Sequence, residues 1–424
     1  MAITRELKSI FSLYEKGDHA EVVSKVKPYL IKNRDCAQAW NLLALSYRFL
    51  GDTAKTEELY SQLISKNPFN IPFKTNYGNL LMSQGRITEA EEVFRDALRV
   101  SPQDINTLNG YGLCKISRND MGAAKKQYDK ILAINPDHKE SKHQLATIYR
   151  KIGDYYKAAE LLGSFSDLKS KVNRLDCLYY ARELDAFRVE CEALITSGAR
   201  SPLLGALIQH ANVEHDFQLE NTFCEDSKDY VLHDDLVRGG YLSEGMFRDL
   251  LDYHDGLCEY TGQPLLEKGH QTSGNVFDSP NEIFTDLGVS LRKYVDRYRA
   301  NFESSSEGFI KRFPDDYKLY GWFVEIEAGG KLKSHMHKEG WLSAAFYLRV
   351  PNTAQGAAAI EFTYDGGEYP STPDKYSSES YNISEGEICM FPSSLFHRTK
   401  PFSDNTTRIS FAFDVQPRDN TAHR

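Results

Sequence analysis

The chain has 424 residues, of which 41% are hydrophobic and 26% charged, and its formal net charge is −9 at pH 7. This length exceeds what one ordinary hydrophobic core needs and predicts two or three domains. No run of eighteen apolar residues occurs and the first residues lack the apolar segment of a signal peptide, so neither a membrane span nor secretion is expected.

Charge is distributed unevenly along the chain. Residues 1–168 contain 24 Lys and Arg against 20 Asp and Glu, whereas residues 169–424 contain 27 against 40. An acidic second part argues against nucleic acid as a partner, because phosphates require a basic surface. Seven scattered cysteines without a C-x-x-C pair are typical of reduced thiols. We therefore expect a cytoplasmic protein that binds neither nucleic acid nor membrane.

The first 168 residues repeat with a period of 34. The rows that keep this period are Pro68, Pro102 and Pro136; Gly17, Gly51, Gly85, Asn119 and Gly153; Ala44, Gly78, Gly112 and Ala146; Ala90, Ala124 and Ala158; and Tyr60, Phe94 and Tyr128. Small residues allow two helices to approach closely, aromatic residues fill the gaps between them, and Gly or Asn permits a turn with positive φ. The pattern resembles the tetratricopeptide repeat, with about four and a half units over residues 3–168.

This resemblance implies a stacked superhelix whose concave surface binds a peptide or a protein. A dimerisation arm or a spacer is the alternative for such a unit. Residues 169–221 remain helical in pattern but lose the period, as in the stretches 175–195 and 200–215. They are interpreted as a helical cap or a degenerate repeat, and no chemistry is indicated there.

The pattern changes after Asp229. Residues 241–257 and 281–302 predict two helices, and short alternating strands are predicted at 317–328, 341–350, 357–365, 386–392 and 407–415. Gly, Pro, Asn and Ser separate these strands. Short strands with such turns indicate a β-sandwich or barrel.

Histidines stand where the predicted strands begin and end. His335 and His337 precede one strand, and residues i and i+2 of an extended chain point to the same face, so both imidazoles can hold one metal ion. His397 follows another strand at a turn. Eleven residues later, Arg408 and Ser410 share one face of the last strand. We expect that face to point into the interior, with Ile409 on the face that packs against the helices.

This order of residues resembles the iron(II)- and 2-oxoglutarate-dependent oxygenases of bacteria over residues 225–415. The motifs that carry the resemblance are His335-Met336-His337, Trp341-Leu342-Ser343, Tyr347-Leu348, Phe391-Pro392-Ser393, His397 and Arg408-Ile409-Ser410. Each motif alone is weak, but together they are specific. The resemblance implies a double-stranded β-helix, or jelly roll, as the core of this part.

The resemblance also implies the roles of individual residues. His335 and His397 would be two ligands of the iron, and His337 stands where these enzymes usually place a carboxylate ligand. The third ligand is therefore either His337, which same-face geometry favours, or a carboxylate such as Glu339 or Glu361. The implied cofactors are Fe(II), 2-oxoglutarate as co-substrate and dioxygen, and ascorbate remains open as an addition.

The resemblance assigns the remaining polar residues to the co-substrate. Arg408 would hold the far carboxylate of 2-oxoglutarate as a two-point clamp, which suits the planar guanidinium. Ser410 would add a hydroxyl hydrogen bond, and Tyr347 would line the pocket beside the co-substrate.

The complete expectation is a multidomain protein with an all-α tetratricopeptide superhelix followed by an α+β domain. The predicted boundaries are 1–168 for the repeats, 169–221 for the cap and 222–424 for the oxygenase domain. The expected function is a dioxygenase, and more narrowly a hydroxylase, whose protein or peptide substrate is recruited by the repeats. Two alternatives stay open: the same chemistry on a small molecule with the repeats used for oligomerisation, and a catalytically inactive scaffold.

Overall fold

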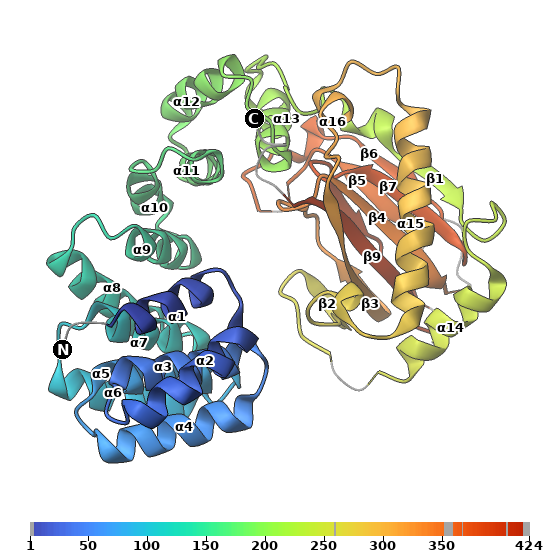
Figure 1. Ribbon diagram of the computed structural model, residues 1–424. Coiled ribbons are helices and arrows are strands. Elements are labelled where there is room, and N and C mark those ends of the chain that lie inside the picture. Colours follow the sequence, from blue (N-terminus) through green and yellow to red (C-terminus); the bar gives the residue numbers. More distant parts are fainter. Residues whose placement is uncertain (1–3, 258–259, 352–358, 367, 404–405, 419–424) are drawn as a thin grey trace. The chain divides into compact units, whose positions relative to one another are not determined.

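The computed structural model describes residues 4–257, 260–351, 359–366, 368–403 and 406–418 (Figure 1). Contacts divide the chain into two compact units, residues 1–164 and residues 165–424. Cys258 and the start of the predicted strand at residues 357–358 lie outside the described residues. The six described cysteines are all free. Within the described ranges, no helix combines the length and the apolar character that crossing a membrane requires.

The first unit is entirely helical in its described residues. Its helices are α1 (Arg5–Glu15), α2 (His19–Lys32), α3 (Ala37–Phe49), α4 (Thr53–Lys66), α5 (Ile71–Ser83), α6 (Ile87–Val100), α7 (Ile105–Ser117), α8 (Met121–Ile134), α9 (Lys139–Lys151) and α10 (Tyr155–Leu162). The turn within each helix pair contains the periodic Gly or Asn with positive φ, for example 78° at Gly51, 73° at Gly85 and 59° at Asn119. The 34-residue period therefore marks the turns, as predicted.

The small periodic residues lie against the periodic aromatic residues. A Cβ atom added to Gly78 would come within 2.6 Å of the Phe94 ring, and one added to Gly112 within 2.8 Å of the Tyr128 ring. Both aromatic side chains are fully buried. A larger residue at either glycine would push the paired helices apart, so these positions set how closely the helices pack.

The second unit begins with helices and continues with a mixed arrangement. Its helices are α11 (Leu168–Tyr180), α12 (Leu184–Thr196), α13 (Pro202–His215), α14 (Glu244–Asp255), α15 (Glu282–Asn301) and α16 (Gly308–Lys311), with 3₁₀ turns η1 (Ser227–Tyr230), η2 (Val276–Asp278) and η3 (Pro373–Lys375). The amphipathic stretch 175–195 is not one continuous helix. It breaks between α11 and α12, where Arg182 adopts a φ of 59°.

Nine described strands form two antiparallel sheets. The strands are β1 (Leu232–Asp235), β2 (Leu266–Gln271), β3 (Tyr317–Leu332), β4 (Leu342–Arg349), β5 (Ile360–Thr363), β6 (Ser378–Tyr381), β7 (Glu387–Pro392), β8 (Phe396–Thr399) and β9 (Arg408–Pro417). The larger sheet has the order β1-β7-β4-β9-β3-β2, and the smaller one has the order β6-β5-β8. A helical repeat region is thus followed by a part that contains sheets.

The central strand β9 separates the hydrophobic core from a polar cavity. Ile409, Phe411 and Phe413 belong to the core that also contains Leu287 of α15 and Leu250 of α14. Figure 1 shows α15 lying along this side of the large sheet. The alternate residues of β9, from Arg408 onward, line the cavity on the opposite face of the sheet.

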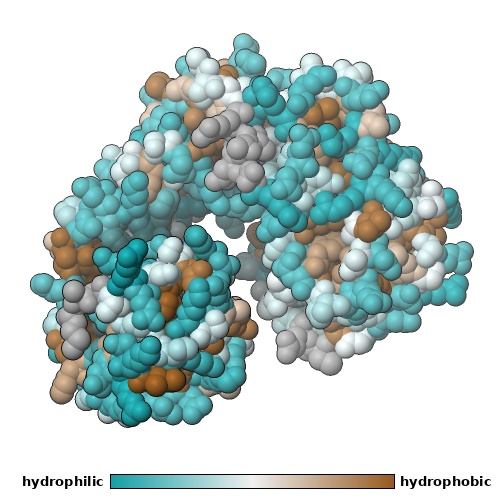
Figure 2. All heavy atoms as spheres, in the orientation of Figure 1, coloured by the Kyte–Doolittle hydropathy of each residue, from teal (hydrophilic) through white to brown (hydrophobic). Residues whose placement is uncertain are grey.

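The molecular surface seen in Figure 2 is mostly hydrophilic, with scattered hydrophobic residues.

Candidate metal centre and its cavity

Three histidines, two from a loop and one from the smaller sheet, meet in this cavity. His335 and His337 lie in the loop between β3 and β4, and His397 lies on β8. The backbones of His335 and His397 form an isolated antiparallel bridge with N–O distances of 3.0 and 2.9 Å. The possible ligand atoms of all three side chains lie within 4.8 Å of one another. The pair was predicted at a strand end, but β3 stops at Leu332 and only the bridge holds His335 in an extended conformation.

The outer nitrogen of each ring faces an oxygen atom. The Nδ1–O distance is 3.0 Å from His335 to the carbonyl of Lys333 and 3.4 Å from His397 to the carbonyl of Leu395. A carbonyl can only accept, so these Nδ1 atoms carry the hydrogen and each Nε2 keeps its lone pair. Such an arrangement is typical of metal-binding histidines.

The third ring is held by a carboxylate. The Nδ1 atom of His337 lies 2.6 Å from Oδ1 of Asp414, which also accepts a hydrogen bond from Ser343 Oγ at 2.7 Å. Ser343 Oγ lies 2.7 Å from Ser393 Oγ, so both serines of the predicted motifs support this carboxylate. The Nε2 atoms of His337 and His335 are 3.2 Å apart. Two lone pairs this close favour a shared cation.

Burial keeps two of the rings neutral. Burial and the neighbouring His337 lower the pKa of His335 to about 3. Burial, together with the imidazoles of His335 and His337, lowers the pKa of His397 well below its ordinary value. Neutral imidazole is the form that binds metals. The donor set therefore fits a divalent transition metal such as iron(II).

The two alternative carboxylates lie elsewhere. Glu339 is exposed and pairs with Lys169 Nζ at 2.8 Å. Glu361 pairs with Arg398 at 2.9 Å and with Lys400 at 3.0 Å. In the register of β5 and β8, Glu361 is opposite Arg398, whereas Phe362 is opposite His397. Glu361 therefore points away from the histidines, and neither carboxylate belongs to the described cluster.

The predicted co-substrate residues line the same cavity, whose volume is about 790 Å³. Arg408 and Ser410 are buried on β9, and Tyr347 is buried on β4 directly opposite Ser410. Burial lowers the pKa of Arg408 and raises the pKa of Tyr347 well above its ordinary value. A guanidinium held away from bulk water is suited to an anion.

Asp414 lines the cavity and contacts His337, but the sequence analysis did not single it out. The alternation that predicted Arg408 and Ser410 in the interior continues along the strand to Asp414. An acidic residue on the predicted inner face of a buried strand could have identified Asp414 from the sequence. Its partner His337 lies 77 positions away, so only the fold joins them.

The loop that carries the ligands is also tied to α11. Lys338 Nζ contacts Asp176 Oδ2 at 2.8 Å, and the hydroxyl of Tyr369 donates to Asp176 Oδ1 at 2.5 Å. Asp176 is fully buried. The helices at residues 168–215 are thus joined to the residue that follows His337.

Comparisons with known proteins match both parts of the chain. Residues 321–414 match the family described as "Putative 2OG-Fe(II) oxygenase", and residues 41–105 and 75–139 match a tetratricopeptide repeat family. Among solved structures, the chain is similar to a tetratricopeptide repeat protein from Parabacteroides merdae, with 18% identity, a TM-score of 0.37, and coverage of 49% of this chain and 84% of that one. A thermophilic TPR protein from Thermus thermophilus shows 20% identity, a TM-score of 0.36, and coverage of 42% and 99%.

Curated proteins also match parts of the chain. The chain is 25% identical over 275 residues to N-alpha-acetyltransferase 16, NatA auxiliary subunit, of Homo sapiens, covering 63% of this chain and 30% of that protein. It is 29% identical over 156 residues to Cellulose synthase operon protein C of Pseudomonas fluorescens, covering 37% and 10%. The chain thus spans less than a third of the length of these relatives. The family models thus show a tetratricopeptide repeat region at residues 41–139 and a domain described as "Putative 2OG-Fe(II) oxygenase" at residues 321–414.

Proposed function

We propose that this chain is an iron(II)- and 2-oxoglutarate-dependent dioxygenase that hydroxylates a protein or peptide. The observation that carries the proposal is the cavity itself, in which three imidazoles converge beside a buried arginine. The family match at residues 321–414 supports the same chemistry. The two sheets would form a double-stranded β-helix, and the bridge between His335 and His397 supports this because it links the chain just after β3 of the larger sheet to β8 of the smaller one.

His335, His337 and His397 would hold the iron through their Nε2 atoms. Three ligands on one side of a metal leave positions open for a co-substrate and for dioxygen. When bound, iron(II) supplies dioxygen activation, coupled to oxidative decarboxylation of 2-oxoglutarate and insertion of one oxygen atom into a C–H bond. Replacing the usual carboxylate ligand with His337 removes one negative charge from the ligand set. Asp414 restores that charge one hydrogen bond away.

The remaining cavity residues would hold the co-substrate. Arg408 can bind a carboxylate with two parallel N–H donors, and Ser410 on the same face can donate a third hydrogen bond. Tyr347 stands opposite Ser410 and stays protonated at neutral pH, so it can donate without adding negative charge near the anion. These residues orient the co-substrate and exclude water from its charged end.

The repeats would recruit the substrate. Tetratricopeptide repeats generally bind proteins or peptides, and this unit has a cavity of about 960 Å³ lined by Trp40, Tyr47 and Leu59. Ile31 at its edge is 71% exposed, as suits a surface that receives an apolar side chain. Binding at a second site would raise the local concentration of the target residue.

The test uses the whole protein with iron(II), 2-oxoglutarate and air. Succinate should form slowly without substrate, and adding a cell extract should produce peptides heavier by one oxygen atom. The matched control is His397→Ala, which lacks one ligand. Absence of succinate above the control in every mixture would contradict the oxygenase. Oxidation of free metabolites alone would favour the small-molecule alternative.

A further inference from the structure

The inner face of strands β3 and β9 continues outward beyond the metal centre. In their register Tyr320 is opposite Asp414, and Lys318 is opposite Gln416. Alternation places Lys318 on the same face as Tyr320 and Trp322, which line the metal cavity. Gln416 lines both this cavity and a neighbouring one. Lys318 therefore stands at the rim of the metal cavity.

Aromatic rings connect this rim to the metal centre. Lys318 Nζ lies 5.6 Å from the centre of the Tyr320 ring, which lies 5.9 Å from the Trp322 ring. Trp322 in turn lies 5.5 Å from the ring of His337. Because Lys318 and Trp322 are four residues apart on an extended strand, the distance between these two residues is about 13 Å. A peptide that touches both Lys318 and Trp322 needs roughly four extended residues.

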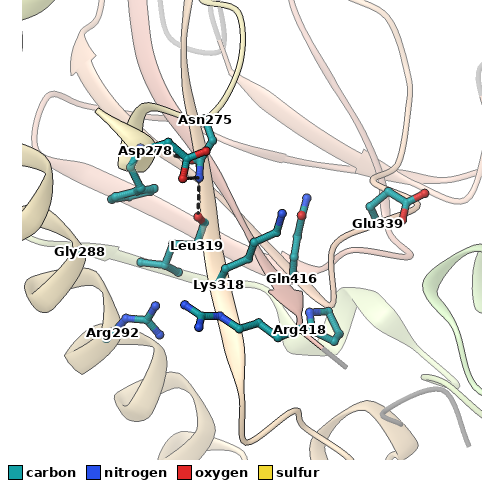
Figure 3. Close-up of a pocket in the computed structure, with 11 residues that line it drawn as sticks. Asn275, Asp278, Gly288, Arg292, Lys318, Leu319, Glu339, Gln416 and Arg418 are labelled. Atoms are coloured by element: carbon teal, nitrogen blue, oxygen red, sulfur yellow. Dashed lines mark hydrogen bonds between the residues drawn. The ribbon is translucent and has the colours of Figure 1, made fainter. Parts of the chain in front are cut away.

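The neighbouring cavity has a volume of about 700 Å³ and is lined by three basic side chains, Lys318, Arg292 of α15 and Arg418. Figure 3 shows the guanidinium groups of Arg292 and Arg418 pointing toward one another. Such a cluster stands out in a part of the chain where 27 basic residues face 40 acidic ones. Like charges repel one another, and a bound anion would relieve the repulsion.

Few carboxylates neutralise these cations. Within the described residues, Lys318 makes no ion pair, and Arg292 donates to the carbonyl of Tyr317 at 3.4 Å rather than to an acid. Arg418 contacts Asp316 at 3.7 Å, with both side chains more than half exposed. Two acids also line the cavity. Asp278 accepts from Asn275 at 3.2 Å, and Glu339 is paired with Lys169.

We propose that this rim cluster binds a carboxylate of an acidic peptide substrate, three or four residues from the residue that is oxidised. The proposal rests on the proposed function, since it defines the substrate class of the same cavity. The length of the aromatic path favours a peptide over a small metabolite. A cluster of positive charges at the rim attracts negatively charged peptides and repels positively charged ones.

The test measures binding, which requires no turnover. Fluorescein-labelled peptide pools that contain Glu, Gln, Lys or phosphoserine at fixed positions are titrated with the whole protein, and fluorescence anisotropy is recorded. The Glu pool should bind at least about fivefold tighter than the Gln pool at low salt. Lys318→Glu should abolish that preference and favour the Lys pool. The matched control Lys293→Glu changes an exposed residue beside Arg292 that does not line the cavity, and this variant should still bind the Glu pool more tightly than the Gln pool.

Three outcomes would overturn the proposal. They are equal binding of the Glu and Gln pools, a Glu preference that survives Lys318→Glu, and tighter binding of the phosphoserine pool. The second outcome would show that the acidic preference does not arise at Lys318. Failure of the proposed function would appear separately, as absence of metal or of succinate formation in the wild-type protein.

Discussion

Two histidine groups lie on opposite faces of strand β3, and they are built differently. On the cavity face, the Nδ1 atoms of the three histidines are occupied by carbonyls and Asp414, and their Nε2 atoms converge. On the helix-covered face, Glu325 lies between two imidazoles. Its Oε2 atom is 3.4 Å from Nε2 of His254 and 3.2 Å from Nε2 of His270.

The difference shows what makes a histidine a ligand. In the second group the Nε2 atoms of both imidazoles face the carboxylate of Glu325, which takes the place where a shared cation would lie, and these contacts fasten β2 and α14 to β3. In the first group the acceptors lie on the outside, which leaves the lone pairs pointing inward. The direction of the lone pairs, rather than the number of histidines, distinguishes the two groups.

The largest expected effect tests this comparison directly. His397→Ala should abolish metal binding, because two imidazoles remain at a site built for three, whereas the matched variant His270→Ala should keep about one metal per chain. Elemental analysis after anaerobic reconstitution with iron(II) measures both. Equal metal loss in the two variants would remove the distinction between the groups.

The next effect concerns the arginine of the cavity. Arg408→Ala should raise the 2-oxoglutarate concentration needed for half-maximal succinate formation by about 10- to 100-fold, since a charge-assisted hydrogen bond contributes about 1.5–3 kcal/mol. Succinate is followed by NMR. The control Arg349→Ala removes an arginine that pairs with exposed Asp255 and should change little. An unchanged requirement in Arg408→Ala would exclude its role as the clamp.

A smaller effect is expected at the carboxylate of each group. Asp414→Asn should weaken metal binding by about tenfold, because an amide oxygen still accepts from His337 but lacks the charge. Glu325→Gln makes the same chemical change on the other face and should leave metal affinity unaltered. Competition with a chelator gives both affinities. If Asp414→Asn binds metal as tightly as wild type, the carboxylate does not tune the centre.

The smallest effect concerns His210, a buried histidine that belongs to neither group. It contacts the hydroxyl groups of Tyr179 at 2.7 Å and Tyr376 at 3.1 Å, and burial lowers its pKa to about 4. The unfolded chain then binds more protons between pH 4 and 6.5, so this contribution to stability is present above that window and is lost as the pH falls.

Between pH 7 and 5.5 the loss from this one residue should be about 1 kcal/mol. Urea unfolding of wild type and His210→Gln at both pH values measures it as the difference in pH dependence. A variant that is destabilised equally at both values would show that His210 contributes packing but no proton linkage.

Much of the fold could be predicted because the repeat period and the alternation of apolar residues follow from the geometry of single helices and strands. The strands with strict alternation, such as β9, were recognised because one of their faces is apolar. The strands β1, β2, β6 and β8 were not predicted. The sequence of β6, SESY, is almost wholly exposed, and it is a strand only because it pairs with β5. Such edge strands carry no apolar alternation to detect.

By itself, the sequence determined the helical repeats, the inner and outer faces of the main strands and the residues able to bind a metal. These follow from periods of 34, 3.6 and 2 residues, which arise from contacts within or between neighbouring segments. Only the tertiary structure decided which acid supports the centre. Glu361 points away because its register differs by one residue from that of Phe362, and Asp414 reaches His337 because β9 lies beside β4. Register and strand order depend on contacts between distant residues, which no local pattern records.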